Sequence, residues 1–492
     1  MPSTTGRAAA TLLFALTIGA AAPAIAQSGA TMTLDGPKVV PAELNMDLRK
    51  LPSLPAGSVA PKIYRPLLKG PPNAKSGGGA APQAPLSPPG PRPPMPGAIQ
   101  NFPGMSFNDI CGGSFFCGGG WPPDTNGDVG SNHFIQAVNI GYAVYDKTGT
   151  LLASFTEDQL FSTAGASACN GNSQGDPVVV YDALADRWIL THFAWTNFAG
   201  GPYFQCVAAS KTSDPVTGGW WLYTLRMDPG GAGLPPVGLI NDYPKFGAWH
   251  DCIIFSANEF NVLNPPATQY QGVAFGSLSR ADLYNGNPLT WALGYMGPAS
   301  NAFSLQPSHS VGRGPTAVAP GTPAWFVSES FSVFAFEVRK FTAGPNCGGG
   351  GSLSALINVP QTSYTGSAFG TSVPQPNTST LLDNLADRVM QKLQYRKVGA
   401  AESLWVAHTV PLASNQSAIQ WAQLDVTGGT IVPTAVQQQI YSPDTTLYRF
   451  MPSIGVDNQG NMAIGFSTSG ATVPNFPSIA YSGRLVGDPA NQ

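Results

Sequence analysis

The sequence predicts an all-β protein, a β-propeller of roughly six or seven blades. Short segments in which aromatic and β-branched residues alternate with polar ones follow one another, and Gly, Asn and Asp separate them. Helical periodicity is nearly absent; the exception is 381–393, and even this segment alternates as a strand does from Val389 to Tyr395. The segments expected to be strands are 134–146, 176–182, 187–195, 252–260, 324–330, 331–338, 403–410, 418–426 and 462–470.

A loosely repeated unit gives the second observation. Each unit has a polar or Pro-containing start, a strand, an Asp-containing turn, a second strand and a later apolar strand. The units begin near Pro123, Asp176, Asp242, Pro307, Asp383 and Pro452. Their spacing, roughly 50 to 75 residues, lies near or above the usual period of propeller blades. The C-terminal "PSIAYSGRL" (477–485) is expected to close the ring by pairing with a strand from near the start of the domain.

The length of the region after the N-terminal segments gives the third observation. About 390 residues follow Asn101, and a single hydrophobic core usually stops growing near ~250–300 residues. Either several small sheets stack as a repeat, or the chain forms two domains. A propeller fits the repeated unit best, and a pair of β-sandwiches is the alternative.

Residues 1–26 are predicted to be an export signal. Arg7 provides the positive charge, "AAATLLFALTIGAAA" the apolar core, and "AIAQ" a cleavage site after Ala26. We therefore expect a secreted protein, periplasmic or extracellular, without membrane insertion; a retained N-terminal anchor is the alternative. Residues 27–100 are rich in Pro, Gly and Ala and are expected to form a disordered tether. The β-propeller domain is expected over 101–492.

The charge composition excludes some partners. The chain has 24 basic and 27 acidic residues and a formal net charge of −3. No basic patch of the kind that binds nucleic acid or an anionic membrane is present in the sequence. We expect a monomer that acts on an extracellular polysaccharide.

Six cysteines, all beyond the predicted signal, agree with an oxidising compartment. Cys111 and Cys117 flank a short Gly-containing loop and form the simplest pair. Cys169 with Cys206 would join neighbouring segments, which leaves Cys252 with Cys347. A metal site is disfavoured for these residues because neither Cys-x-x-Cys nor a Cys/His cluster occurs.

The motif Asp-x-Leu-Ala-Asp-Arg occurs twice, at 182–187 and at 383–388. One interpretation places Arg187 and Arg388 in a central funnel, where each guanidinium would bind a carboxylate or sulfate. The other interpretation is a strand–turn–strand hairpin in which Asp caps the turn. Repetition favours the hairpin, because a repeat fold reuses its turns.

Long segments of the chain resemble a known group of proteins. "PPDTNGDVGSNHFIQAVN", "GDPVVVYDALADRWILTHFA", "LLDNLADRVMQKLQYR" and "YSPDTTLYRFMPSIGVDNQGNMAIGFSTS" are similar to exported bacterial β-propeller proteins, most of them hypothetical. The resemblance implies the fold and the export, and it brings no catalytic residues. More remotely, the architecture is similar to sialidase-like propellers that act on glycans, although the Asp-box pattern of sialidases is missing.

A calcium site is one hypothesis for "DTNGDVG". Asp124, Asn126 and Asp128 alternate as ligands do in calcium loops, and their oxygens suit a hard cation. Gly127 and Ile135 do not fit the EF-hand pattern, so a turn rich in Asp and Asn is the alternative. No cofactor is expected to be required, beyond a structural Ca²⁺ here.

The remaining candidates would serve an enzyme that cleaves polysaccharide, as a glycoside hydrolase or a lyase. His309, with Arg313 nearby in a predicted loop, is the best candidate for a general acid or base. A hydrolase needs two facing carboxylates, and a lyase needs a base with a group that neutralises a uronate. The candidate catalytic residues are His309, Arg313, Arg388, Tyr395 and Asp242, and the candidate substrate-binding residues are Arg187, Arg449 and Trp249. The alternative is a non-catalytic propeller that binds a glycan or a protein at the cell surface.

Overall fold

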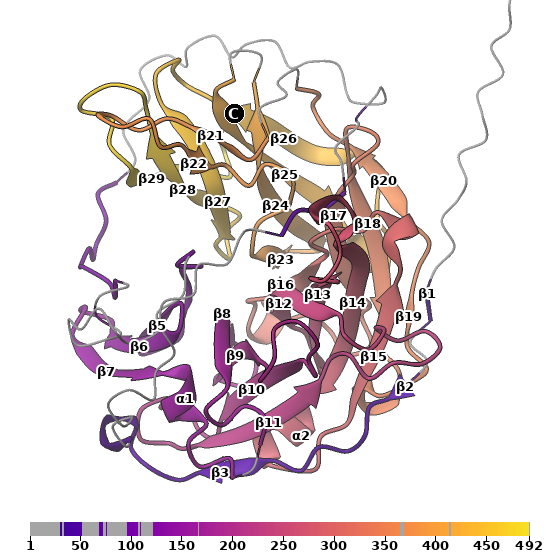
Figure 1. The fold of residues 1–492 in the computed structure, drawn as a ribbon. Helices are drawn as coiled ribbons and strands as arrows, with labels where there is room; N and C mark the ends of the chain where they lie inside the picture. The colour runs from indigo at the N-terminus through magenta and orange to yellow at the C-terminus, as the bar shows by residue number, and fades with distance from the viewer. Residues whose placement is uncertain are drawn as a thin grey trace, which may run out of the picture.

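The computed structural model describes residues 30–31, 34–51, 68–71, 75, 96–106, 109, 122–165, 167–364, 369–412 and 415–491. The predicted signal and the predicted Cys111–Cys117 pair lie outside the described residues. The fold is all-β, with sheets arranged around a centre in a propeller-like ring (Figure 1). Within the described residues, no helix is long and apolar enough to cross a membrane.

The sheets follow one another along the chain. The first contains β4 (Asn126–Val129), β5 (His133–Val138), β6 (Gly141–Asp146) and β7 (Leu151–Thr156). The second contains β8 (Ser173–Asp182), β9 (Arg187–Ala194), β10 (Phe204–Ser210), β11 (Trp220–Arg226) and β3 (Ala42–Leu44). The third contains β12 (Ile240–Ala248), β13 (Cys252–Phe260), β14 (Tyr270–Ser279), β15 (Trp291–Met296) and β2 (Leu34–Asp35).

A ten-stranded sheet comes next. Its first part contains β16 (Gln306–Ser310), β17 (Ala324–Glu329), β18 (Ala335–Thr342), β19 (Ser352–Leu353), β20 (Ile357–Pro360) and β1 (Ala30–Thr31). Its second part contains β23 (Leu393–Val398), β24 (Ala401–Pro411), β25 (Ser417–Asp425) and β26 (Ala435–Tyr441). The two parts meet where β16 pairs with β23 in parallel.

The remaining elements are small. A three-stranded sheet contains β27 (Tyr448–Val456), β28 (Met462–Ser469) and β29 (Ser478–Arg484), and a two-stranded one β21 (Thr371–Val373) and β22 (Leu382–Asp383). The short helices are α1 (Glu157–Leu160) and α2 (Arg280–Asn285). The predicted strands agree with these bounds, most closely 252–260 with β13. There are two exceptions. Residues 134–146 form two strands, β5 and β6, joined by a turn at 139–140, and the first four residues of 331–338 form the turn before β18.

The innermost strand of each sheet lies beside the innermost strand of the next, around the centre. These strands are β4, β8, β12, β16, β23 and β27. Parallel alignment is seen for two neighbouring pairs of these strands. β16 pairs with β23 in parallel, and β4 runs alongside β8, where Asn126 Oδ1 accepts the backbone N–H of Val179 at 3.0 Å and Asp128 accepts that of Tyr181 at 2.7 Å. We call the end of the ring where these strands begin the leading rim, and the end where they finish the trailing rim.

Part of the predicted tether belongs to the ring. β3 pairs with β11, β2 pairs with β15, and β1 pairs with β19. The N-terminal segment therefore adds the outermost strand to three successive parts of the ring, as the indigo ribbon in Figure 1 shows. This corrects the expectation of a disordered tether for 30–31, 34–35 and 42–44.

The two Asp-x-Leu-Ala-Asp-Arg motifs fold differently. The first joins β8 to β9 as the predicted hairpin, and Asp182 caps its turn by accepting the backbone N–H groups of Leu184 and Ala185. The second does not form a hairpin, which corrects the prediction. Its start pairs with β21, and Val389 bridges to His408 of β24. A similar turn sequence therefore serves two different connections.

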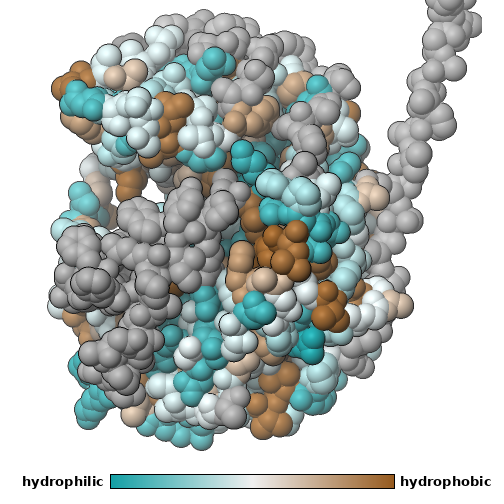
Figure 2. All heavy atoms as spheres, in the orientation of Figure 1, coloured by the Kyte–Doolittle hydropathy of each residue, from teal (hydrophilic) through white to brown (hydrophobic). Residues whose placement is uncertain are grey.

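The C-terminal strand does not close the ring as predicted. Within the described residues, β29 pairs with β28 alone, and Tyr481 donates a hydrogen bond to the carbonyl of Pro96. Phe102, a little further along, packs on Phe134 and Tyr145 of the first sheet. Residues 96–106 thus link the last sheet to the first. Several large apolar residues next to β29 are exposed, among them Val473, Phe476 and Leu485, and Figure 2 shows hydrophobic residues on the surface at its upper left.

Apolar side chains between neighbouring sheets form the core, and two disulfides reinforce it. Cys169–Cys206 joins the segment before β8 to β10, and Cys252–Cys347 joins β13 to the loop before β19. Both pairings confirm the sequence prediction. Trp220 and Trp249 are 0% and 4% exposed, because large aromatic rings fill the space between sheets.

Candidate functional site

Backbone strain recurs where the innermost strands begin. At the leading rim, non-glycine residues adopt positive φ: Asp124 (41°), Asp176 (49°), Tyr243 (52°), Ser304 (48°) and Met451 (51°). Pro follows directly in three of these places, and the strand pairing shifts register nearby. Such conformations cost of order 1–3 kcal/mol each and cluster at functional sites. The strained residues therefore mark the leading rim as a candidate functional site.

Three carboxyl groups meet there, one from the start of each of three successive innermost strands. Asn139 joins two of them: its Nδ2 donates to Asp124 at 2.7 Å, and its Oδ1 accepts the backbone N–H of Asp176 at 2.8 Å. The Asp124 and Asp176 carboxyls also share a hydrogen bond, and Asp242 lies near enough to act on Asp124 through its charge. We call Asp124, Asp176 and Asp242 the carboxyl cluster.

The carboxyl cluster changes the protonation of its members. Burial raises the pKa of Asp124 well above its usual value, and the charges of Asp176 and Asp242 raise it further. Asp124 therefore holds a proton at a pH where an ordinary carboxyl is ionised. Asp124, Asp176 and Asp242 are half-buried as whole residues, while the carboxyl group of Asp124 is itself largely enclosed. A carboxyl group with a raised pKa can act as a general acid.

Two cations flank the carboxyl cluster. Arg388 is buried and forms a bidentate pair with Asp387, with N–O distances of 2.6 and 3.0 Å. Its guanidinium also lies 5.2 Å from the ring centre of Tyr243 and 4.9 Å from that of Phe303. Burial lowers the pKa of Lys245, and the charge of Arg388 lowers it further. Lys245 donates to the carbonyl of Tyr243 at 3.2 Å, at the turn that carries Asp242.

A segment from the N-terminal part of the chain lies against this rim. Leu68 packs in an aromatic cluster that includes Phe303, and Gly70 is so near the Phe303 ring that a Cβ would lie 2.7 Å from it. Lys75 forms an ion pair with buried Glu329 and a hydrogen bond with Tyr364, and its side chain is only 4% exposed. Leu68 and Gly70 therefore lie one side chain, Phe303, away from Arg388, and Lys75 is anchored separately at Glu329.

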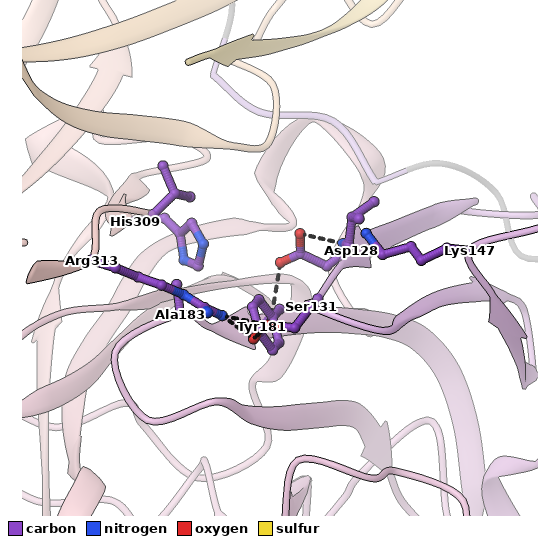
Figure 3. Close-up of a pocket in the computed structure, with 10 residues that line it drawn as sticks. Asp128, Ser131, Lys147, Tyr181, Ala183, His309 and Arg313 are labelled. Carbon is purple, nitrogen blue, oxygen red and sulfur yellow. Dashed lines mark hydrogen bonds between the residues drawn. The ribbon is translucent and has the colours of Figure 1, made fainter. Parts of the chain in front are cut away.

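A separate pocket opens at the trailing rim. Its volume is about 390 Å³, and its lining comes from the ends of β4, β8 and β16, the loops after them, and Lys147 in the turn after β6. Figure 3 shows His309, Arg313, Asp128 and Tyr181 pointing toward this pocket. His309 and Arg313, which the sequence grouped together, are thus brought together by the structure. They lie at the opposite end of the innermost strands from the carboxyl cluster.

The other predicted site residues lie outside both places or serve the fold. Arg187 donates to the carbonyls of Ala185 and Asp186 at 3.2 and 3.0 Å, within its own turn. Arg449 pairs with Asp444. Tyr395 is buried against Trp249, whose Nε1 donates to the carbonyl of Thr322 at 2.8 Å. The substrate-binding role expected for Trp249 is therefore corrected, because its ring is enclosed.

The residues of the predicted calcium loop tie strands together. Asn126 bonds to the backbone of β8, and Asp128 accepts the N–H of Tyr181 and pairs with Lys392. Asp124 instead belongs to the carboxyl cluster, where its side chain contacts that of Asp176. Among the residues that the structure describes, no group of three or more His, Cys, Asp or Glu side chains has a geometry that could hold a metal ion.

Sequence reasoning missed Asp176 and Asn139 as members of one site. Asp124 was taken as a metal ligand, Asp242 as a catalytic residue, and Asp176 only as the start of a unit. A signal was available in part: both Asp176-Pro177 and Asp242-Tyr243-Pro244 place Asp just before Pro at the start of a unit.

Comparisons with known proteins add little to this site. No family model and no curated protein matches the chain. Among solved structures, a GH43 endo-arabinanase from Bacillus licheniformis is 11% identical, with 63% of this chain and 94% of that chain covered and a TM-score of 0.29. An α-L-arabinofuranosidase from Lactobacillus brevis is 10% identical, with coverages of 65% and 92% and a TM-score of 0.31. The N11 neuraminidase-like protein of A/flat-faced bat/Peru/033/2010 is 6% identical, with coverages of 73% and 71% and a TM-score of 0.29. Similarity this low assigns no activity.

Proposed function

We propose that this protein is a secreted glycoside hydrolase that cleaves an extracellular polysaccharide at the leading rim. The observation that carries the proposal is the carboxyl cluster, in which a protonated Asp124 and the carboxylates of Asp176 and Asp242 meet in a half-buried, strained part of the ring. Hydrolysis of a glycosidic bond needs one carboxyl group that gives a proton and a second that acts as base or nucleophile.

The hydrogen bonds suggest how the roles divide. Asp124 gives its proton to the leaving oxygen, since its pKa is raised. Asp176 bonds directly to Asp124, so the two are too close to hold a sugar ring between them, and Asp176 serves to position the acid. Asp242 acts on Asp124 through its charge alone, and the second catalytic carboxylate should stand about 5–9.5 Å from the acid. Asp242 is therefore assigned as base or nucleophile.

Hydrolysis is favoured over elimination by the places of the lyase candidates. A lyase would need a base beside a cation that neutralises a uronate. Arg388 lies at the leading rim, whereas His309 lies at the trailing rim and Tyr395 is buried against Trp249. Arg388 and Tyr243 are then left to position the substrate, with Asp387 holding the guanidinium in place.

We further propose that the ring has six blades, counting the ten-stranded sheet as two blades joined through β16 and β23. Two disulfides support export to an oxidising compartment, periplasmic or extracellular. The protein is proposed to act as a monomer.

The test is a screen of the purified mature protein against a panel of polysaccharides. Release of reducing ends without absorbance from unsaturated uronates would support hydrolysis, and the appearance of that absorbance would indicate a lyase. Asp242→Asn should lose the activity, while Lys340→Gln, at an exposed position on β18, should keep it. Binding of a polymer without cleavage of any would overturn the hydrolase and favour the alternative, a non-catalytic glycan-binding propeller.

A further inference from the structure

The trailing-rim pocket contains a buried donor without a partner. His309 is 1% exposed, and its Nδ1 accepts the backbone N–H of Ala248 at 3.1 Å. Because Nδ1 accepts, a neutral imidazole must carry its proton on Nε2. Nε2 is buried and has no hydrogen-bond partner among the described residues, and the His309 side chain borders a pocket large enough for a monosaccharide. A buried donor left unpaired is costly, which points to a ligand that accepts from it.

A second donor group faces the same space. The guanidinium of Arg313 is held through Nη2, which donates to Ser131 Oγ at 2.9 Å and to Tyr181 Oη. No other hydrogen bond of its guanidinium is found among the described residues, and its side chain is 49% exposed. Nε and Nη1 therefore remain for a ligand. These two nitrogens point to different sides of the guanidinium, and the two N–H groups of Nη1 can donate to an oxygen of a carboxylate.

The charges around the pocket favour a single negative charge on the ligand. Arg313 and Lys147 line the pocket beside Asp128, and Lys392 neutralises that carboxylate. Asp128 also accepts the N–H groups of Val129 and Tyr181, so its oxygens are already engaged. With Asp186 counted near Arg313, three cations face two carboxylates. One positive charge is left for an anion.

We propose that this pocket is a binding site for a sugar carboxylate, a uronate, with Arg313 and His309 as its principal donors and Lys147 as a further cation. The site lies at the opposite rim from the carboxyl cluster, so it is separate from the proposed hydrolytic centre. It would hold a uronate unit of a polymer or a released acidic sugar, and it needs no cleavage to do so.

The test measures binding of sodium glucuronate, which has no glycosidic bond, by isothermal titration calorimetry at low ionic strength. The wild type is expected to bind glucuronate at least ten times more tightly than glucose. Arg313→Gln should weaken glucuronate binding at least tenfold, Lys147→Gln should weaken it severalfold, and the surface control Lys340→Gln should not change it. The ¹⁵N signal of His309 Nε2 should shift when glucuronate binds.

Equal binding of glucose and glucuronate, or binding that Arg313→Gln leaves unchanged, would overturn the proposal. Binding of inorganic sulfate as tightly as glucuronate would reduce the site to a general anion site and would also contradict the assignment to a sugar. Glucuronate has no glycosidic bond to hydrolyse, so none of these results bears on the proposed hydrolase activity, which the polysaccharide screen tests separately.

Discussion

The two rims of the ring use charge in opposite ways. At the leading rim, Asp124, Asp176 and Asp242 bring like charges together, and one of them must keep a proton. At the trailing rim, Asp128 is neutralised by Lys392, and donors from His309 and Arg313 are left over. In our proposals, the crowded carboxyl groups of the leading rim supply an acid for hydrolysis and lower the stability of the fold. The unpaired donors of the trailing rim bind an anionic sugar. The same innermost strands carry both arrangements, one at each end.

The largest expected effect is on the chemistry of the leading rim. Asp242→Asn removes the second carboxylate but keeps its shape, so hydrolysis should fall about a thousandfold, in the range of general acid–base contributions. The measurement is kcat on whichever polymer the wild type cleaves. Lys340→Gln is the matched surface control. An Asp242→Asn enzyme with near-normal kcat would remove the carboxyl cluster from the chemistry.

Anchoring of the N-terminal segment at the leading rim predicts a large effect on stability. Burial alone would raise the pKa of Glu329, but His408 and Lys75 overcome this and lower it to about 2. Lys75→Met leaves Glu329 with one cation fewer, and breaking a buried pair costs about 3 to 5 kcal/mol. Urea unfolding should show this loss of stability.

Lys69 provides the control for this experiment, because it lies in the same segment and is exposed. Lys69→Met should be neutral. If both variants are equally stable, the contact of Lys75 with Glu329 does not anchor the segment.

At the trailing rim, burial of His309 should make the free energy of unfolding depend on pH. Burial lowers the pKa of His309 to about 4, from an ordinary value of 6.5, and Lys392 contributes to the shift. Between these two pH values, the imidazole is mostly protonated in the unfolded chain and mostly neutral in the folded protein. The contribution of His309 to the free energy of unfolding is therefore fully present above about pH 6.5. About 3 kcal/mol of it is lost as the pH falls toward 4. Asp128 faces the same imidazole and opposes the shift.

His309→Gln keeps an acceptor for Ala248 and removes the titrating group. Its unfolding free energy should therefore fall less steeply than that of the wild type between pH 6.5 and 4. Parallel curves for the two proteins would show that His309 titrates normally in the folded state.

The sequence predicted the strands well and the sites only in part, for physical reasons. β13 was predicted residue for residue because its apolar run ends in turn residues on both sides. The turn at Phe331–Phe334 was missed because its residues are as apolar as the strands beside it. His309 and Arg313 were grouped correctly because they are four residues apart. The carboxyl cluster was not found, since Asn139 joins Asp124 to Asp176 across separate sheets.

The smallest expected effect is at the leading rim, where a substitution should increase the stability of the fold, whereas most substitutions decrease it. Because the folded pKa of Asp124 is raised, this group stabilises the fold at low pH and loses that contribution as pH rises through the folded value. Asp124→Asn should therefore raise stability at neutral pH by roughly 1 kcal/mol. A rise in the melting temperature would show it. A fall would mean that the Asp124 carboxyl is ionised and stabilised by its neighbours.

The comparison of the two rims is tested most directly by measuring kcat and KM for Asp124→Asn and Arg313→Gln side by side, on a polymer that the wild type cleaves. Our account predicts that Asp124→Asn loses at least a hundredfold in kcat. Arg313→Gln should lose far less in kcat and act mainly on KM. The reverse order, with Arg313→Gln inactive and Asp124→Asn active, would place the chemistry at the trailing rim and contradict the account.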